Sequence, residues 1–309
     1  MDEAESLESY LFNRHLRQDL PPDGPAPPLP PGTETRILTD DGLSLAATIW
    51  DPAGRERRRV VVIAAATGVL RGYYAPFAAW LSARGFAVVT FDYRGMGDSR
   101  GAASAPTMRE WGERDLASVV AWAARALGDG THVAVVGHSV GGQLVGLLPE
   151  PARVSALVTV GSQSGDFRLW PLPTRLAMAV IWYGVVPGVT HAVGYLPGAL
   201  GIGEDLPAGV ALEWARWCRT PGYLVGAEGV SRREGFAKLA APTLAFGFDD
   251  NAYAPRAAID ALLDLYVGAR IERRQLARSE GRFGHFGFFR KRHRRLWREA
   301  ASFLDRSVG

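Results

Sequence analysis

The sequence predicts an α/β fold in which helices cover both faces of a mostly parallel β-sheet. Two observations carry this prediction. Short apolar runs, which are typical of strands buried on both faces, alternate with amphipathic stretches of helical period. One long stretch, residues 162–241, interrupts the alternation and exceeds the length of an ordinary loop. We therefore expect one sheet domain that carries one large insertion.

The alternation assigns strands and helices from about Thr33 onward. The predicted strands are Glu34–Leu38, Ser44–Trp50, Arg59–Ala66, Phe86–Phe91, His132–Val136, Val154–Val160, Pro242–Phe248 and Arg270–Leu276. The predicted helices are Tyr74–Ala83, Met108–Leu127, Gly141–Leu148, Arg256–Tyr266 and Arg290–Leu304. A turn at Asp40–Gly42 makes the first two strands a hairpin. In such a sheet, ligands bind at the carboxyl ends of the parallel strands.

The same pattern divides the chain of 309 residues into three parts. Residues 1–32 form an N-terminal extension with a proline-rich linker, residues 33–161 and 242–309 form the core, and residues 162–241 form the insertion.

Composition bears on the compartment. Cys218 is the only cysteine, which excludes an intrachain disulfide and favours a reducing environment. The N-terminus begins with acidic residues and lacks the apolar core of a signal peptide. The longest apolar stretch, Leu176–Val186, is stopped by Pro187 and is too short to cross a bilayer. We expect a cytoplasmic protein without a transmembrane segment.

The basic excess, a net charge of +3, comes largely from arginines near the C-terminus. They are Arg270, Arg273, Arg274, Arg278 and Arg282, followed by Arg290, Lys291, Arg292, Arg294 and Arg295. Such a cluster can bind nucleic acid or anionic lipid, but it is more often a solvated helix face. No zinc-finger or RNA-binding motif accompanies it, so we expect no nucleic acid partner.

A serine motif carries the main chemical signal. Gly137-His138-Ser139-Val140-Gly141 follows a predicted strand directly and precedes a short helix. G-x-S-x-G in that setting is typical of a nucleophile elbow, a sharp turn that exposes the serine hydroxyl above the sheet. The alternative is a glycine-rich turn around a buried serine.

A serine hydroxyl needs a base to become a nucleophile, and an acid to orient that base. Of six histidines, His285 lies in a glycine-flanked loop after the last predicted strand. Asp249 and Asp250 end the preceding strand, and only one of them should face the histidine, because successive side chains point opposite ways. The developing oxyanion needs amide donors, which we assign to Val140 and to Thr67, after the strand Arg59–Ala66.

With these motifs the chain resembles the α/β-hydrolase superfamily. The segment Phe91–Ser99 is similar to the family's D-x-R-G-x-G-x-S segment, and the likeness runs from about Thr33 to the C-terminus. The family pattern G-x-x-D matches Gly247–Asp250 and favours Asp250. Many members have His-Gly where this chain has Ala65-Ala66, which leaves the register of the oxyanion donors open.

Three further strings resemble a bacterial subgroup of predicted serine α/β-hydrolases. They are Gly194–Gly198, Trp214–Trp217 and Gly284–Arg290. This resemblance supports the α/β-hydrolase fold and the catalytic set Ser139, Asp250 and His285, and it names no substrate.

The resemblance implies a serine hydrolase that cleaves a small-molecule carboxylic ester or thioester through an acyl-enzyme, without metal or organic cofactor. Two alternatives stay open: an acyltransferase with the same catalytic residues, and a non-catalytic binding protein on this fold. The oligomeric state is not predicted.

In this superfamily an insertion at residues 162–241 usually forms a lid. Its aromatic residues are Trp170, Trp182, Tyr183, Tyr195, Trp214, Trp217 and Tyr223. They favour an apolar pocket for an acyl group, or equally the lid's own core.

Overall fold

The computed structural model of the chain describes residues 30–52, 59–101, 105–126, 132–201 and 203–308. Most of the predicted N-terminal extension lies outside these ranges.

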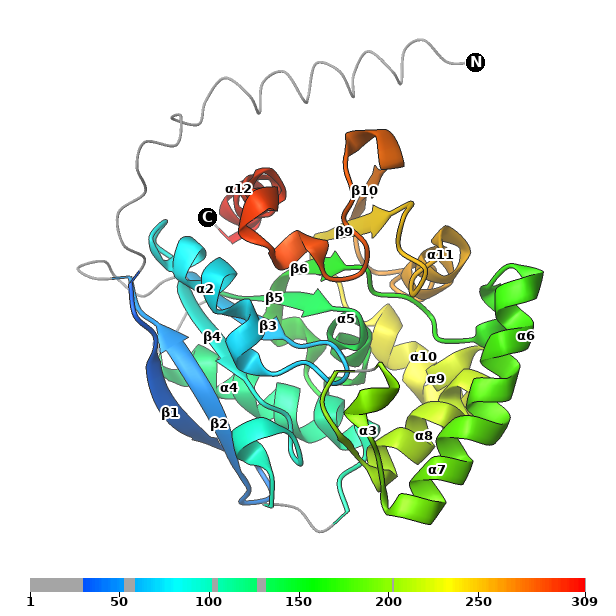
Figure 1. Cartoon of the computed structure of the whole chain (residues 1–309). Helices are drawn as coiled ribbons and strands as arrows, with labels where there is room; N and C mark the ends of the chain where they lie inside the picture. Colours follow the sequence, from blue (N-terminus) through cyan, green and yellow to red (C-terminus); the bar gives the residue numbers. More distant parts are fainter. Residues whose placement is uncertain (1–29, 53–58, 102–104, 127–131, 202, 309) are drawn as a thin grey trace.

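The core is an eight-stranded sheet with the strand order β1-β2-β4-β3-β5-β6-β9-β10 (Figure 1). Its strands are β1 (Thr33–Leu38), β2 (Ser44–Trp50), β3 (Arg59–Ala64), β4 (Ala87–Phe91), β5 (His132–His138), β6 (Val154–Val160), β9 (Thr243–Phe248) and β10 (Ile271–Leu276). β2 pairs antiparallel with β1 and with β4, and the other neighbours are parallel. The predicted sheet is confirmed, including its opening hairpin.

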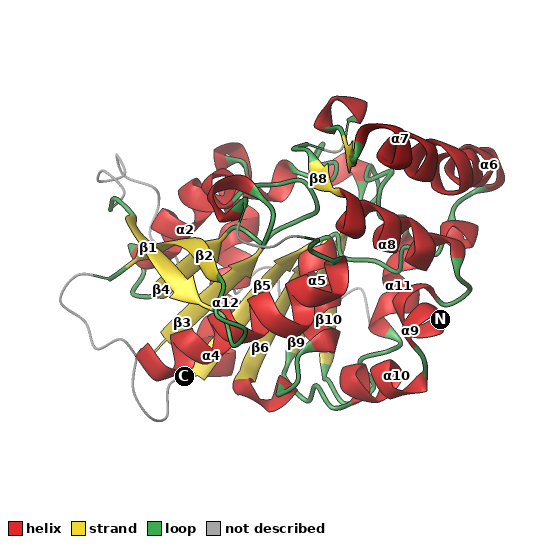
Figure 2. Cartoon of the chain, turned by 90° about the horizontal axis from the view of Figure 1, so that it is seen from below, coloured by secondary structure: helices red, strands yellow, loops and turns green. Residues whose placement is uncertain are grey.

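Helices cover both faces of this sheet (Figures 1 and 2). On one face α2 (Ala75–Ser82) packs against α12 (Arg294–Val308), where the rings of Phe77 and Trp297 have centroids 5.3 Å apart. On the other face lie α4 (Ala117–Ala126) and α5 (Val140–Leu144), and α11 (Arg256–Leu263) follows β9. β4 is buried along its whole length, as expected of a strand covered from both sides.

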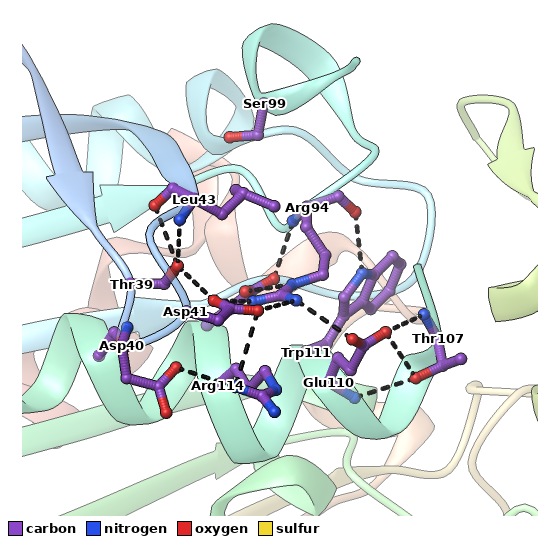
Figure 3. Close-up of polar contacts among 12 residues, drawn as sticks. Thr39, Asp40, Asp41, Leu43, Arg94, Ser99, Thr107, Glu110, Trp111 and Arg114 are labelled. Carbon is purple, nitrogen blue, oxygen red and sulfur yellow. Dashed lines mark hydrogen bonds and ion pairs between the residues drawn. The ribbon is translucent and has the colours of Figure 1, made fainter. Parts of the chain in front are cut away.

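The helix predicted at Met108–Leu127 is not one regular α-helix. α3 (Met108–Glu110) leads into a π-helical turn, Trp111–Leu116, before α4 begins. The turn makes contacts to the buried Arg94. Asp115 accepts hydrogen bonds from the backbone N and from Nε of Arg94, at 2.8 and 2.7 Å. Trp111 Nε1 donates to the Arg94 carbonyl oxygen at 3.1 Å (Figure 3).

The D-x-R-G-x-G-x-S segment therefore has a structural role here. Asp41 and Glu110 complete the ion pairs around the Arg94 guanidinium, and the pairing lowers the pKa of Asp41 to about 2 (Figure 3). Ser99 Oγ accepts from Ala46 N and donates to the carbonyl of Asp92. These bonds attach the loop after β4 to β2 and to the neighbouring helix.

The predicted insertion, residues 162–241, is mostly helical. It contains α6 (Leu172–Val180), α7 (Val186–Val193), α8 (Ala208–Arg219), α9 (Tyr223–Glu228), α10 (Val230–Ala237) and a small sheet of β7 (Tyr195–Leu196) with β8 (Leu206–Pro207). α6 and α7 form its outer edge in both views (Figures 1 and 2).

The expectation that Pro187 ends the apolar stretch of the insertion is wrong. A π-helical turn, Ile181–Val185, joins α6 to α7 directly before Pro187, and the helix continues through the proline to Val193. Among the described residues, this helix, Leu172–Val193, is the one whose length and composition would suffice to cross a membrane, which by itself is weak evidence of a span.

Candidate active site

Ser139 lies at the tip of a sharp turn between β5 and α5. β5 ends at His138 and α5 begins at Val140, so Ser139 alone makes the turn. Its backbone has φ 52° and ψ −117°, a conformation that residues other than glycine rarely adopt. Ser139 lines a cavity of about 340 Å³. The strand, turn and helix predicted around the serine are thus present.

Glycines give this turn the room that it needs. A Cβ on Gly141 would lie 2.1 Å from the carbonyl oxygen of Ala64 at the end of β3. A Cβ on Gly137 would lie 2.4 Å from the backbone of Gly142. Both approaches are closer than any real Cβ contact, so the motif's glycines follow from packing between β3, β5 and α5.

His285 reaches the same cavity from the loop after β10. Gly284, with φ 55°, shapes that loop, and the imidazole lines the cavity together with Ser139. Burial disfavours the charged ring and lowers the pKa of His285 from its ordinary value to about 4. Among the described residues no hydrogen bond yet joins Ser139 to His285, as is common in sites without substrate.

The partner of His285 is Asn251. Its Nδ2 lies 3.0 Å from His285 Nδ1, and its Oδ1 accepts the N–H of Tyr253 at 3.0 Å. Asn251 is almost fully buried. Asn251 is not among the residues predicted from the sequence, because an asparagine side chain carries no negative charge.

The expected contact between Asp250 and His285 is not formed. Asp250 Oδ2 instead accepts the backbone N–H of Phe283 at 2.8 Å, two residues before His285, and the exposed Asp249 accepts from Gln275 Nε2 at 2.6 Å. The strict alternation used for the prediction stops at Phe248. There a turn begins, closed by the bond from Asn251 N to the Phe248 carbonyl, and it brings the next residue toward the imidazole.

His138 points away from the cavity, as expected on a tight turn, and is fully buried. Its Nδ1 lies 2.9 Å from Tyr74 Oη and its Nε2 lies 2.9 Å from the carbonyl oxygen of His285. Tyr74 Oη also accepts the N–H of Ala66 at 2.8 Å. Burial holds the pKa of His138 well below its ordinary value, so the ring is neutral and donates from Nε2. This network joins the loops that carry Ala66, Ser139 and His285.

Val140 and Thr67 are the predicted donors to the oxyanion. Both residues line the cavity beside Ser139. The Ala66 amide is already bound to Tyr74 Oη and so does not serve in place of Thr67.

The cavity is mostly apolar and belongs half to the insertion. Its lining from the insertion includes Trp170, Met178, Ile181, Trp182, Trp214 and Tyr223. Gln143 and Gln163 supply polar groups at the wall, and Tyr223 Oη donates to Gln143 Oε1 at 2.9 Å. Such a lining suits a small ligand with an apolar body.

The two tryptophans singled out in the sequence have different positions. Trp214 borders the cavity and packs against Trp182, with ring centroids 4.7 Å apart. Trp217 is fully buried, and its Nε1 donates to Glu228 at 2.8 Å. The aromatic residues of the insertion therefore include both cavity wall and packed core. Among the described residues, no cluster of His, Cys, Asp or Glu suited to hold a metal ion is found.

Comparisons with known proteins agree with this description. A family model described as the alpha/beta hydrolase fold matches residues 59–188. A search of the curated proteins found no match. Among solved structures, the chain is similar to the alpha/beta hydrolase GrgF from Penicillium, at a TM-score of 0.63 and 15% identity over 90% of this chain and 99% of that one.

Two further structures are similar. Est1E of Butyrivibrio proteoclasticus, solved with ferulic acid bound, has a TM-score of 0.61 and 18% identity over 89% of this chain and 99% of that one. A thermophilic esterase of Thermogutta terrifontis has a TM-score of 0.57 and 17% identity over 90% of this chain and 100% of that one. Such identities show the fold alone. Together with the family model, which covers less than half of the chain, they show that the chain has the alpha/beta hydrolase fold.

Proposed function

We propose that the protein is a serine hydrolase that cleaves a carboxylic ester or thioester with an apolar acyl group. The observation that carries this proposal is the strained Ser139 facing the same apolar cavity as His285. A strained backbone persists only where the surrounding structure enforces it, and such strain concentrates at functional sites.

In the proposed reaction, Ser139 Oγ attacks the acyl carbonyl carbon while its proton passes to His285 Nε2. The amides of Val140 and Thr67 stabilise the oxyanion. His285 then returns the proton to the leaving alcohol or thiol as the bond to the acyl carbon breaks. Water attacks the acyl-enzyme with the same base, the acid leaves, and Ser139 regains its proton.

Asn251 gives this mechanism a particular constraint. For Nε2 to accept a proton, Nδ1 must carry one, and the group facing Nδ1 must accept a hydrogen bond. Asn251 can do so only when its amide turns over and presents Oδ1, which gives up the hydrogen bond that Oδ1 accepts from the Tyr253 N–H. A neutral amide orients the ring, as in the Cys-His-Asn proteases, but stabilises the imidazolium less than a carboxylate. The low pKa of His285 is consistent with a partner that carries no charge.

The apolar acyl preference rests on the cavity's lining. Its volume, about 340 Å³, lies at the low end for small-molecule sites, which favours medium-length or single-ring acyl groups over long chains. A cytoplasmic location remains our prediction, and an acyltransferase would use the same residues with another acceptor.

The test is covalent labelling by a fluorophosphonate probe, combined with turnover of p-nitrophenyl esters. We expect labelling at Ser139, and a loss of turnover of about 10⁴-fold or more in Ser139→Ala with an unchanged circular dichroism spectrum. Labelling at another residue, or an active Ser139→Ala variant, would contradict the proposal.

A further inference from the structure

The helix Leu172–Val193 presents an apolar face to solvent. Its exposed large side chains include Leu172, Leu176, Val180, Ile181, Tyr183 and Val193. Only 17% of its most apolar stretch is buried, which distinguishes it from the core helix of a soluble domain. We call this surface the α6–α7 face. Leu172, Leu176, Val180 and Tyr183, at steps of four, four and three residues, lie along one side of the helix, and exposed apolar surface of this kind marks an interaction site.

The α6–α7 face continues into the mouth of the cavity. Ile181 belongs to the face and also lines the cavity. Leu200, Tyr253 and Phe286 line the cavity too, and each is exposed to solvent. The same helix also contributes the buried Trp182 to the cavity wall. Whatever covers the face therefore also covers the entrance to Ser139.

Charge indicates what covers it. From Phe167 to Gly203 the sequence has no Asp or Glu, and Arg175 on α6 is basic. The neighbouring Arg168 is paired with Asp166, 3.4 Å away, and donates to the Arg219 carbonyl. The guanidinium of Arg219 lies over the ring of Tyr183, 5.4 Å from its centroid. An apolar helix face with basic residues beside it and tyrosines at its edge has the composition of segments that lie in the interface of an anionic bilayer.

We propose that the α6–α7 face docks onto an anionic lipid surface and places the cavity mouth against it. A second copy of the chain fits less well, because the helix Leu172–Val193 has no acidic side chain to pair with Arg175 of the other copy in a symmetric contact. The face is also a convex helical ridge at the edge of the molecule, to which a fluid bilayer conforms more readily than another ridge (Figure 2). That the docked enzyme draws an apolar substrate from the lipid rests on the proposed function, whereas docking itself does not.

The experiment is co-sedimentation of the full chain with vesicles of equal parts phosphatidylcholine and phosphatidylglycerol, at low and high salt. The test variant is Leu176→Ser/Val180→Ser, at side chains 62% and 65% exposed. The matched control is Leu38→Ser/Val267→Ser, at side chains 66% and 75% exposed but outside the insertion. We expect the wild type and the control to bind alike, and the test variant to partition about tenfold more weakly or worse.

Each other outcome is informative. Equal binding by the two variants, or no binding by the wild type, would overturn the proposal. So would binding that is lost only in Lys291→Gln/Arg292→Gln, since this would assign docking to the C-terminal arginine cluster. A concentration-dependent dimer that the test variant abolishes, without vesicle binding, would identify a second copy as the occupant. Ser139→Ala should bind vesicles like the wild type, so that failure of docking is distinguishable from failure of the proposed chemistry. Thermal unfolding of the variants checks that they remain folded.

Discussion

Asn251 Nδ2 lies 3.0 Å from His285 Nδ1, so the candidate base of this site faces an amide instead of a carboxylate. An amide in place of a carboxylate changes the charge of the site more than its geometry. A carboxylate would favour the imidazolium and raise the pKa of His285, whereas here burial acts on that pKa unopposed and lowers it to about 4.

Replacing Asn251 by Asp should therefore strengthen the base. In Asn251→Asp we expect kcat/KM at neutral pH to rise by about tenfold or more, because the carboxylate accepts from Nδ1 and stabilises the imidazolium that forms. The acid limb of the pH profile should move upward by about one pH unit or more. Asp249→Asn, on the exposed neighbour, is the control and should leave both quantities unchanged. An Asn251→Asp variant with reduced kcat and an unshifted limb would show that Asn251 does not act through the imidazole.

Asp250 should matter through the backbone of the His285 loop. In Asp250→Asn the side-chain oxygen can still accept the N–H of Phe283, so we expect a loss of only a few-fold in kcat/KM. In Asp250→Ala that donor loses its partner, at a cost of about 1–3 kcal/mol in the free energy of unfolding. Steady-state kinetics and urea unfolding of the two variants check this. A loss near 10⁴-fold in Asp250→Asn would instead restore the sequence-based assignment of Asp250 as the orienting acid.

The low pKa of His285 predicts an unusual pH profile. Only the neutral ring can act as base, so kcat/KM should stay nearly level from about pH 8 down to about pH 5 and fall by half near pH 4. A half-point near the ordinary value of about 6.5 would indicate that substrate or solvent keeps the ring hydrated.

Stability should fall over the same range. The folded pKa of His285 lies below its unfolded value of about 6.5. The unfolded chain therefore takes up this proton first as pH falls, and the stability present above about pH 6.5 is lost progressively toward pH 4. Initial rates must be read before unfolding, with circular dichroism recorded at each pH.

The two tryptophans of α8 should separate specificity from stability. Trp214→Ala enlarges the cavity wall, so we expect the preference among p-nitrophenyl esters, from acetate to decanoate, to shift toward bulkier acyl groups with modest loss of stability. Trp217→Ala removes a fully buried ring and should lower the free energy of unfolding by about 3–5 kcal/mol. Equal effects of the two substitutions on acyl preference would show that Trp214 does not contact substrate.

Removing one hydroxyl tests the network around His138. Tyr74→Phe leaves the Ala66 N–H and His138 Nδ1 without their shared partner and should cost about 1–3 kcal/mol of stability. Because the network joins the loops that carry Ala66 and His285, we expect kcat to fall while KM changes little. A variant that loses stability alone, with kcat intact, would restrict Tyr74 to packing.

The strands of the core could be predicted from the sequence because their signal is local. Ser44–Trp50 and Val154–Val160 were predicted at their observed bounds, since continuous apolar runs need no knowledge of neighbours. The π-helical turn at Trp111–Leu116 could not be predicted, because it depends on Arg94, which approaches from another part of the chain.

In the site, too, the residues with a local sequence signal were predicted and those that depend on distant contacts were not. Ser139 and its elbow have a local signature in the sequence. The glycine-flanked loop after the last strand indicated His285, which lines the same cavity. Asn251 was missed because the turn after Phe248 changes the direction of side chains, and alternation cannot describe a turn. Which of Trp214 and Trp217 borders the cavity depends on the packing of α8 against the sheet domain, which no short-range pattern contains.

The close approach of Gly141 to Ala64 determines how far apart α5 and the end of β3 lie. Ala64 ends the strand that leads to Thr67, and Gly141 stands two residues after Ser139, so their contact fixes the gap between nucleophile and oxyanion loop. A Cβ on Gly141 would lie only 2.1 Å from the Ala64 oxygen, so a single methyl group would push the two backbones apart. Adding that one carbon atom would widen this gap without removing any reacting group.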